Sequence, residues 1–466
     1  MQSLIWLTDA LWHPWLLGCF LLTGFYCSVK TGFFQLFGLC SWLSATAGSI
    51  LRPAGKRQSG EISQLQALCT ALASTIGTGS IAGVATAIWL GGPGAVFWMW
   101  VSAALGMMTG FVEKTLAVRT RIRGTGGEWM CGPMYYLRTG VGSRILAGWY
   151  AAACLCASLI SGNLVQSNAI ADILHTAFGW ERIIVGAGVS FAVAVVMVGG
   201  LKRVAQVSSW LVPVMTVLYL GSGLAVLIFR AEILLETIKM IFFCAVSPKA
   251  VFGGGIGYSV SYAMRYGVAR GVFTNEAGLG TSSIAHAAAE VDHPARQGMW
   301  GILEVGVSTI MVCTVTALTI LTSGVYDPVL GAAGVPPVCG IGAPLTAAAF
   351  SSVLGAGGTL VVTASLLLFA FSSMIGWSYY GVQCLTYLGG RKPVIFWFRL
   401  VFFVVAAAGS VCDVEQTWIL VDLCNAMMAI PNLIGVWILS GKGLEELRDW
   451  EQKKVFQKNK NKGLTF

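Results

Sequence analysis

Charged residues are scarce in this sequence: Asp, Glu, Lys and Arg together make up 11% of its 466 residues. An ordinary soluble domain has roughly 25%. Apolar residues (Ala, Val, Ile, Leu, Met, Phe, Trp, Tyr and Cys) make up 56%, which is more than the interior of a soluble fold of this size can hide. Most of the apolar surface must therefore face lipid, which excludes an ordinary soluble protein.

The sequence also lacks the motifs of common enzyme classes. The nucleophile elbow, the phosphate loop and the dinucleotide fingerprint are absent as complete motifs. The 13 Cys include no Cys-x-x-Cys pair, as expected of reduced, buried thiols. His286, Glu290 and His293 have the spacing of metal-binding side chains on one helix face, but no third strong ligand is near and Pro294 should end that helix. We therefore predict a cytoplasmic loop without a metal, in a protein that is not an enzyme.

The net charge of +9 does not indicate a nucleic-acid partner, because the basic residues lie in short clusters between apolar runs. Such clusters keep loops on the cytoplasmic side of a membrane. If the loop 39–61 is cytoplasmic and later loops alternate, 23 of the 29 Lys and Arg lie inside. We expect the N-terminus outside, the C-terminus inside, and a basic cytoplasmic tail over 440–466.

Long apolar runs dominate the chain. A helix that crosses the hydrocarbon core needs about 20 apolar residues. This length predicts an all-α polytopic membrane protein, a single transmembrane domain over 1–466 with about eleven membrane helices. The candidate spans run near 14–38, 62–90, 95–118, 145–172, 183–200, 206–229, 233–264, 298–321, 358–388, 394–412 and 417–439.

Two of these spans carry glycine-rich breaks. Residues 74–80 read Ser-Thr-Ile-Gly-Thr-Gly-Ser, and 247–257 contain Ser-Pro followed by Gly-Gly-Gly-Ile-Gly. Gly and Pro should interrupt both helices within the membrane, where broken backbone is tolerated only beside a protein-enclosed or water-filled cavity. If 14–38 is an extra helix, each break opens a five-helix repeat, 62–229 and 233–439. That pattern is typical of an inverted-repeat transporter with its binding site between the breaks, although glycine can also serve close helix packing.

The breaks carry groups that suit a zwitterion. Helix N-termini favour a carboxylate, and exposed carbonyls at a C-terminal end suit an ammonium group or sodium. Glycine lets a ligand approach the backbone closely, so the substrate should be small. Asn163 and Gln166, three residues apart, can present two amides from one helix face, and Ser373 and Trp377 can wall the pocket. The expected substrate-binding residues are Gly77, Thr78, Gly79, Asn163, Gln166, Val246, Gly253, Gly254, Ser373 and Trp377.

Acidic residues are expected to have little part in coupling. Glu113, Glu304 and Asp422 lie near the predicted helix ends, where a side chain can reach water. No buried acid is expected at either break. Sodium coupling is therefore favoured over proton coupling through a carboxylate.

Several blocks resemble the bacterial alanine or glycine:cation (sodium) symporter family, within the amino acid–polyamine–organocation superfamily. They are 71–79, 81–88, Gly-Gly-Pro-Gly at 91–94, Gly-Pro-Met-Tyr-Tyr at 132–136, 271–280, 376–381 and 427–432. The resemblance implies a leucine-transporter-type 5+5 fold with one extra N-terminal helix, and sodium-driven uptake of alanine or glycine. It also implies sodium ligands at the carbonyls of Ala73 and Ile76 and the hydroxyls of Ser372 and Ser373.

The sequence departs from the family pattern at Ser80, Ser308 and Val382, and these departures concern the coupling ion, its stoichiometry or the choice of substrate. The Asn-Glu-Ala-Gly segment at 275–278 should lie on the cytoplasmic side, away from the site, as a gate or as a packing element.

The predicted function is sodium-coupled symport of a small neutral amino acid across the bacterial inner membrane, with Na+ as coupling ion and no organic cofactor. The lipid bilayer is the expected environment, and neither nucleic acid nor an obligate protein partner is expected. Proton-coupled transport is the alternative within the transporter class. A passive channel is less favoured because a repeated filter or charge ring is missing.

Overall fold

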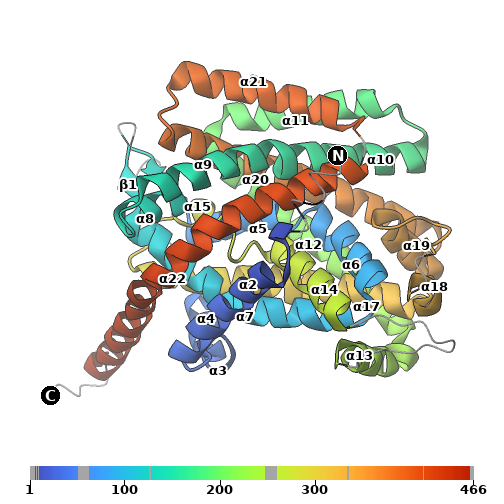
Figure 1. Ribbon diagram of the computed structural model, residues 1–466, viewed down its shortest axis with the longest axis horizontal. Coiled ribbons are helices and arrows are strands. Elements are labelled where there is room, and N and C mark those ends of the chain that lie inside the picture. Colours follow the sequence, from blue (N-terminus) through green and yellow to red (C-terminus); the bar gives the residue numbers. More distant parts are fainter. Residues whose placement is uncertain are drawn as a thin grey trace.

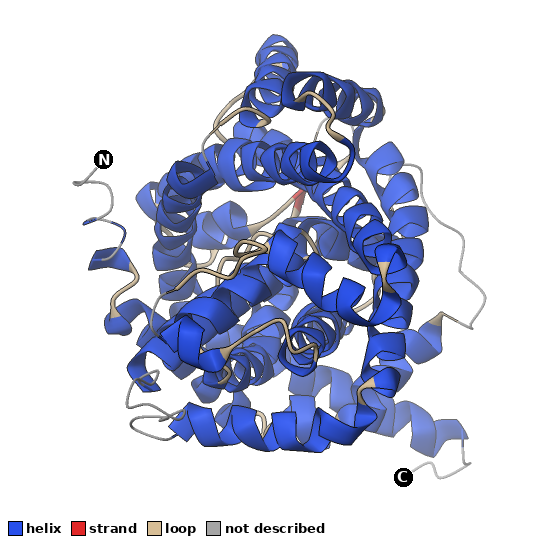
Figure 2. Ribbon diagram, turned by 90° about the vertical axis from the view of Figure 1, so that its right-hand side faces the viewer, coloured by secondary structure: helices blue, strands red, loops and turns tan. Residues whose placement is uncertain are grey.

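Nearly all of the described chain is helical. The computed structural model describes residues 6, 8, 10–50, 62–124, 127–246, 260–332, 335–412 and 414–461. Within these ranges the only sheet is a pair of two-residue antiparallel strands, β1 (Ile122–Arg123) and β2 (Trp129–Met130) (Figure 2). Most of the long helices lie side by side, and the end of α22 extends beyond the others (Figure 1).

The first half of the chain contains one broken helix and a series of long ones. In chain order the helical segments are α2 (Pro14–Lys30), α3 (Phe34–Phe37), α4 (Leu39–Ala45), η1 (Ala47–Ser49), α5 (Gln64–Thr75), η2 (Gly79–Gly83), α6 (Val84–Gly91), α7 (Gly94–Thr120), α8 (Pro133–Thr139), α9 (Arg144–Leu159), η3 (Ile160–Leu164), α10 (Val165–Phe178), α11 (Arg182–Val198), α12 (Gly200–Phe229) and α13 (Ala231–Val246).

The second half continues in the same way. Its segments are α14 (Val260–Asn275), α15 (Ser283–His286), α16 (Pro294–Val305), η4 (Gly306–Cys313), α17 (Thr314–Thr322), α18 (Pro328–Ala332), α19 (Ala343–Leu354), α20 (Ala356–Tyr387), α21 (Lys392–Gly409) and α22 (Val414–Asn461). The segments η2, η3 and η4 are π-helical, a geometry that is frequent at functional sites.

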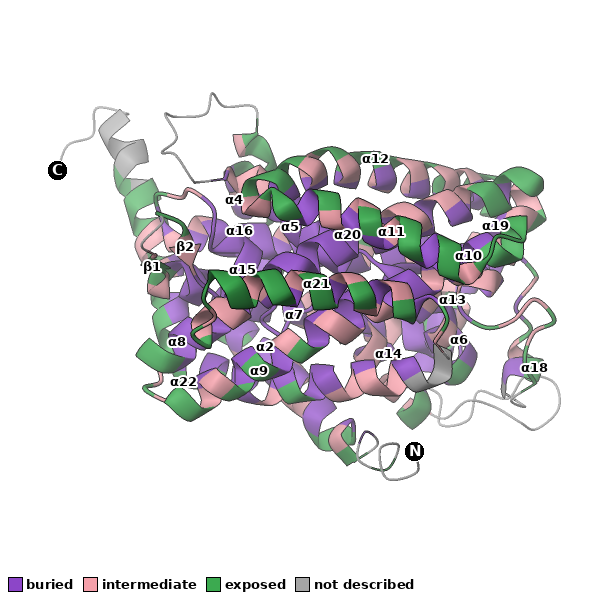
Figure 3. Cartoon of the chain, turned by 90° about the horizontal axis from the view of Figure 1, so that it is seen from above, coloured by how far each residue is buried: buried purple, intermediate pink, exposed green. Residues whose placement is uncertain are grey.

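Within the described residues, seven helices are long and apolar enough to cross a membrane, or eight if the bent pair α5 and α6 counts as one span. Large apolar side chains are exposed on the outer faces of α11, α12 and α21, including Phe191, Trp210 and Trp397. Buried residues gather in the interior (Figure 3). Such an outer surface suits lipid, so the chain is a multi-pass membrane protein. The total of eleven membrane helices stays a prediction.

The segment 322–357 separates the predicted spans 298–321 and 358–388, and it contains α18 and α19. Helix α19 is too short for a full span, and its apolar face packs on α17 and α20. The second predicted break, at 247–257, lies outside the described residues.

The predicted break in the second span, 62–90, is present. Ser63 caps α5 through a reciprocal pair of hydrogen bonds with Gln66, as in a capping box. The helix ends at Thr75 because Ile76 has ψ of 88°, and α5 and the segment Gly79–Gly91 are bent by 55°. This break leaves backbone polar groups without helical partners.

Candidate functional site

A small cavity lies at the break. Its volume is about 10 Å³, enough for about one water molecule. Five segments far apart in the sequence meet there. They contribute Ser74, Thr75, Gly77 and Gly79; Ser161 and Gln166; Phe273, Glu276 and Leu279; Ser373 and Trp377; and Asn425. The structure therefore brings five of the predicted substrate contacts, Gly77, Gly79, Gln166, Ser373 and Trp377, to one cavity.

The side chain of Gln166 links η3 and α10 to the break. Its Oε1 accepts a hydrogen bond from the backbone N–H of Thr78 at 3.3 Å, and its Nε2 donates to the carbonyl of Ser161 at 3.2 Å. The hydroxyl of Thr78 is buried and has no hydrogen-bond partner among the described residues. An unpaired buried hydroxyl is costly, so a ligand that contacts it gains binding energy there.

At the break, two backbone carbonyls lose the hydrogen bonds that they would accept in an unbroken helix. The N–H of Gly77 donates to Thr75 at 3.1 Å and that of Thr78 to Gln166, so neither reaches the carbonyl four residues earlier. Those carbonyls, of Ala73 and Ser74, instead accept from the hydroxyls of Ser372 at 3.1 Å and Ser373 at 2.8 Å. The break and α20 thus hold oxygen atoms of the kind that bind a hard cation.

Two aromatic rings fill the space around the cavity. A Cβ placed on Gly79 would lie 2.5 Å from the Phe273 ring, and one placed on Gly162 would overlap Trp377. The absence of a side chain at these two glycines therefore lets both rings pack against the backbone. Since alanine is several times larger than one water molecule, the lining must rearrange before the cavity can hold an amino acid.

A second, larger cavity begins beside the first. Its volume is about 600 Å³, and it runs from Thr78 past Asn168 to Gly342, with Trp418 in its lining. The rings of Trp418 and Phe273 are in edge contact, with centroids 5.4 Å apart. Phe273 lines the small cavity, so this aromatic pair lies between the two.

Comparisons with known proteins agree with this geometry. Residues 1–464 match the sodium:alanine symporter family. The chain belongs to this family. It is 40% identical over 453 residues to the sodium/alanine symporter AgcS of Methanococcus maripaludis, covering 95% of this chain and 96% of that protein. It is also 35% identical over 432 residues to the amino-acid carrier protein AlsT of Bacillus subtilis, with 91% and 90% covered.

A solved structure shows the same fold at low sequence identity. The manganese transporter of Eremococcus coleocola has a TM-score of 0.54 and 14% identity, with 82% of this chain and 80% of that chain covered. The family and these relatives are transporters, which confirms the prediction that the protein is not an enzyme.

The Asn-Glu-Ala-Gly segment of this family member lies at the site, so the prediction that it lies away from the site was wrong. Glu276 and Leu279 both line the small cavity. Glu276 is 3% exposed, and it is a buried acid at the break, which the sequence analysis did not expect. Its position was missed because the loop after α14 folds back into the bundle.

Two further acids are buried, against the prediction that they lie near water. Glu113 lies within α7 and Glu304 within the continuous helix from Pro294 to Thr322, and neither is exposed. Glu304 Oε2 is 3.1 Å from Lys114 Nζ and 3.1 Å from His286 Nε2. Asp422, the third acid, pairs with Arg270 at 3.4 Å. The sequence analysis missed these pairs because their residues lie in largely apolar segments and the partners come from different helices.

Glu113 ties three parts of the transporter together. Its Oε1 accepts from the N–H of Gly278 at 2.9 Å and from Asn432 Nδ2 at 2.6 Å. Asn432 also donates to the Gly278 carbonyl at 2.8 Å and accepts from the hydroxyl of Tyr136. The Asn-Glu-Ala-Gly segment is thus joined to α7, α8 and α22, which supports the packing role predicted for it.

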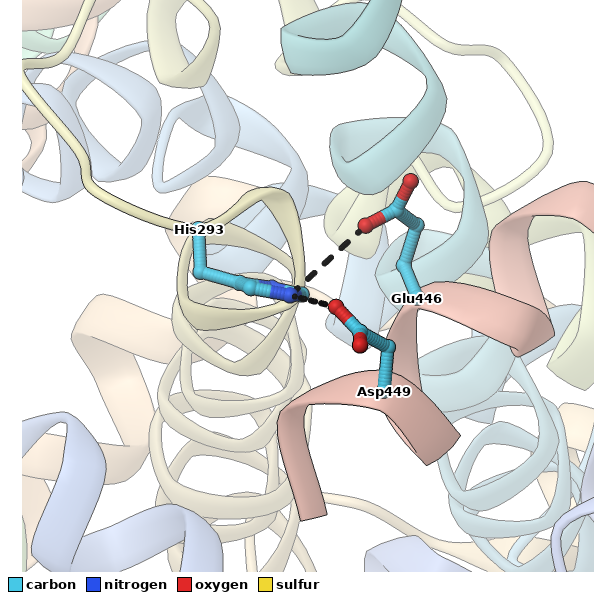
Figure 4. A group of neighbouring side chains, drawn as sticks. All are labelled: His293, Glu446 and Asp449. Atoms are coloured by element: carbon cyan, nitrogen blue, oxygen red, sulfur yellow. Dashed lines mark hydrogen bonds and ion pairs between the residues drawn. The ribbon is translucent and has the colours of Figure 1, made fainter. Parts of the chain in front are cut away.

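The predicted histidine group does not form one helix face. Helix α15 ends at His286, and Pro294 begins α16 instead of ending a helix, as its position at N1 favours. His293 instead meets Glu446 and Asp449 of α22, at 3.8 and 2.9 Å (Figure 4). Its Nδ1 accepts from the N–H of Ala295 at 3.2 Å, so its Nε2 carries the proton. This tautomer donates to Asp449 and does not favour a metal.

The remaining predicted substrate-binding residues either do not line the small cavity or lie outside the described residues. Asn163 is buried but donates to the Phe402 carbonyl at 2.6 Å. The π-helical turn η3 contains Asn163, so its side chain does not lie on the same face as that of Gln166. Val246 is 67% exposed at the end of α13 and does not line the cavity. Gly253 and Gly254 lie outside the described residues.

The three departures from the family pattern lie in different surroundings. Ser80 is buried in η2, where its hydroxyl lacks a partner in the described part of the chain. Ser308 is buried in η4 and donates to the Val305 carbonyl at 3.4 Å. Val382 is partly buried on α20. Only Ser80 adjoins the break.

Proposed function

We propose that the protein is a secondary active transporter that takes up a small neutral amino acid, alanine or glycine, together with sodium. The observation that carries the proposal is the small cavity at the break, where Gly77, Gln166 and Ser373 meet. Membership of the sodium:alanine symporter family supports it.

Sodium binds, in this proposal, between α5 and α20. Its ligands are the carbonyls of Ala73 and Ile76 and the hydroxyls of Ser372 and Ser373. The 3.1 Å contact between Ser372 and Ala73 supports this set, since ligands of one small cation must lie close together. The amino-acid carboxylate is then bound at the start of η2 and α6, near Thr78, where the helix dipole favours negative charge.

The helices are proposed to form a 5+5 inverted repeat over 62–229 and 233–439, with 14–38 as an extra helix. The N-terminus lies outside and the tail 440–466 in the cytoplasm, in the inner membrane of a bacterium. The larger cavity then opens outward, and the Phe273–Trp418 pair closes the site from it. Buried contacts such as Glu113–Asn432 close the inner side. Alternating access exchanges these two closures.

Replacing Ser372 or Ser373 with alanine should weaken sodium dependence. Each change removes one hydroxyl ligand from a buried site, and losing a supporting group costs roughly 10- to 100-fold in metal affinity. The measurement is alanine uptake against sodium concentration in proteoliposomes, with Ser352→Ala as control because that hydroxyl bonds only within α19. Unchanged sodium affinity in both variants would remove these residues from the sodium site.

Competition should rank amino acids by size. Because the cavity is small and bounded by Phe273 and Trp377, alanine and glycine should compete with labelled alanine, and serine more weakly. Leucine and phenylalanine should compete at least roughly 5- to 150-fold more weakly than alanine, since overpacking a filled interior costs about 1–3 kcal/mol even for small additions. Equal competition by leucine contradicts the proposed substrate class.

Proton-coupled transport remains the second candidate, and a specific observation favours it. Glu276 places a carboxyl group in the cavity, so a proton-binding group is present where the sequence analysis expected none. Uptake driven by a proton gradient in the absence of sodium distinguishes this candidate from the first.

A further inference from the structure

Glu276 differs from every other side chain in the lining of the small cavity. Among the described residues that line it, Glu276 is the only one with an ionisable group. The others offer hydroxyls, amides, glycine backbone, aromatic rings and one Leu. Glu276 is also 97% buried, since its exposure is 3%.

The backbone fixes this residue in an unusual conformation. Its φ is 54°, and Phe33 is the other non-glycine residue with positive φ in the described chain. The N–H of Glu276 donates to the carbonyl of Val272 at 2.8 Å, and the Leu279 N–H donates to the Glu276 carbonyl at 3.0 Å. Strained backbone of this kind persists where the surroundings determine it, and it clusters at functional sites.

The carboxyl group accepts one hydrogen bond from the described part of the chain. One oxygen, Oε2, accepts a hydrogen bond from the hydroxyl of Thr281. No salt bridge reaches Glu276 in the described part of the chain. Two cations of the bundle pair with other acids: Lys114 with Glu304, and Arg270 with Asp422. A buried carboxylate without a cation is unfavourable, so this group either takes up a proton or binds a positively charged ligand.

A zwitterionic amino acid supplies that charge beside the groups that suit its other end. The break offers backbone N–H groups and a helix N-terminus for a carboxylate. Among the described residues that line the cavity, Glu276 is the only one with a negative group. We propose that the Glu276 carboxylate binds the ammonium group of the substrate and thereby selects amino acids over hydroxy acids of the same size. This inference rests on the proposed function and extends it to a specificity-determining residue.

The test compares alanine with lactate, which has a hydroxyl in place of the ammonium group. Binding of both is measured by displacement of labelled alanine from the purified full-length protein in detergent with saturating sodium. In Glu276→Gln, alanine affinity should fall about 10- to 100-fold, the range for a hydrogen bond to a charged group. Lactate affinity should not fall, so the preference for alanine should shrink by at least the same factor.

Thr281→Val is the matched control. Gln at 276 can still accept from the Thr281 hydroxyl, whereas Thr281→Val removes that hydrogen bond and keeps the carboxylate. The inference predicts that Thr281→Val retains the preference for alanine. If the preference is lost in Thr281→Val and kept in Glu276→Gln, the carboxylate acts only by holding its loop, and the inference is overturned.

A second pair of variants tests the charge at position 276 with side chains that suit its backbone conformation. Asp and Asn both tolerate positive φ, so Glu276→Asp and Glu276→Asn should both fold, and only the first keeps a charge. Alanine preference kept in Glu276→Asp and lost in Glu276→Asn supports the inference; equal preference in both overturns it. If the wild-type protein binds no small amino acid, the proposed function itself is contradicted. If the wild-type protein binds alanine and Glu276→Gln keeps the wild-type preference for alanine over lactate, only this inference is contradicted.

Discussion

Replacing Lys114 with methionine should be among the most destabilising single changes in the protein. Lys114 and Glu304 are both unexposed, with Nζ and Oε2 3.1 Å apart. Removing one member of a buried ion pair leaves an uncompensated charge and typically costs about 3–5 kcal/mol. A large fall in the thermal unfolding temperature of the purified protein, or loss of folded protein on expression, is the expected result.

Removing the second charge should restore much of the lost stability. In the double variant Lys114→Met/Glu304→Gln the uncompensated carboxylate is gone, and His286 can still bond to the amide. Replacement of both partners of a buried pair is often nearly neutral. Lys239→Met, on the exposed part of α13, serves as the control and should change stability little. If Lys114→Met unfolds like wild type, this pair has no structural importance.

The second large effect is expected at Gly77. A Cβ at this position would lie 2.9 Å from Ser373 Oγ and 3.3 Å from Gln166 Oε1, so a methyl group there would intrude on two groups of the cavity lining. Overpacking of this kind costs about 1–3 kcal/mol, which corresponds to roughly 5- to 150-fold in affinity. Gly77→Ala should therefore weaken alanine binding and transport by that range while the protein still folds.

Gly221→Ala is the matched comparison for Gly77→Ala. Gly221 lies in α12, and a Cβ there would meet no atom within 4 Å. Alanine is also the better helix former by about 1 kcal/mol, so Gly221→Ala should transport like wild type. Binding and transport measured side by side in the two variants separate a local effect at the cavity from a general intolerance of added methyl groups. Wild-type affinity in Gly77→Ala contradicts the placement of the substrate at the break.

Several helix positions were predictable because apolar length alone identifies membrane spans, but α14 was not predicted as a separate helix. The predicted span 95–118 corresponds to α7, 183–200 to α11, and 394–412 to α21, each within a few residues. The break at 74–80 was predictable for a similar reason, since Gly77 and Gly79 weaken any helix. Local composition was less informative for 322–357, where two short helices depend on packing against α17 and α20.

The composition of the site was predictable only in part. Gln166 and Ser373 were identified from their spacing and reach the cavity. Asn163 was wrongly expected on the same face, because a π-helical turn cannot be inferred from residue spacing. Glu276 was missed because its place depends on how the loop after α14 folds against α5 and α20. Lys114 and Glu304 are 190 residues apart, so only the tertiary structure pairs their charges.

Uptake of labelled alanine into proteoliposomes tests the central claim most directly. The purified protein is reconstituted, and an inward sodium gradient is compared with an inward potassium gradient and an inward proton gradient without sodium. The proposed function predicts accumulation above the equilibrium level with the sodium gradient alone, and loss of that accumulation when a sodium ionophore is added. Accumulation with protons alone, or no accumulation under any gradient, would contradict sodium-coupled symport.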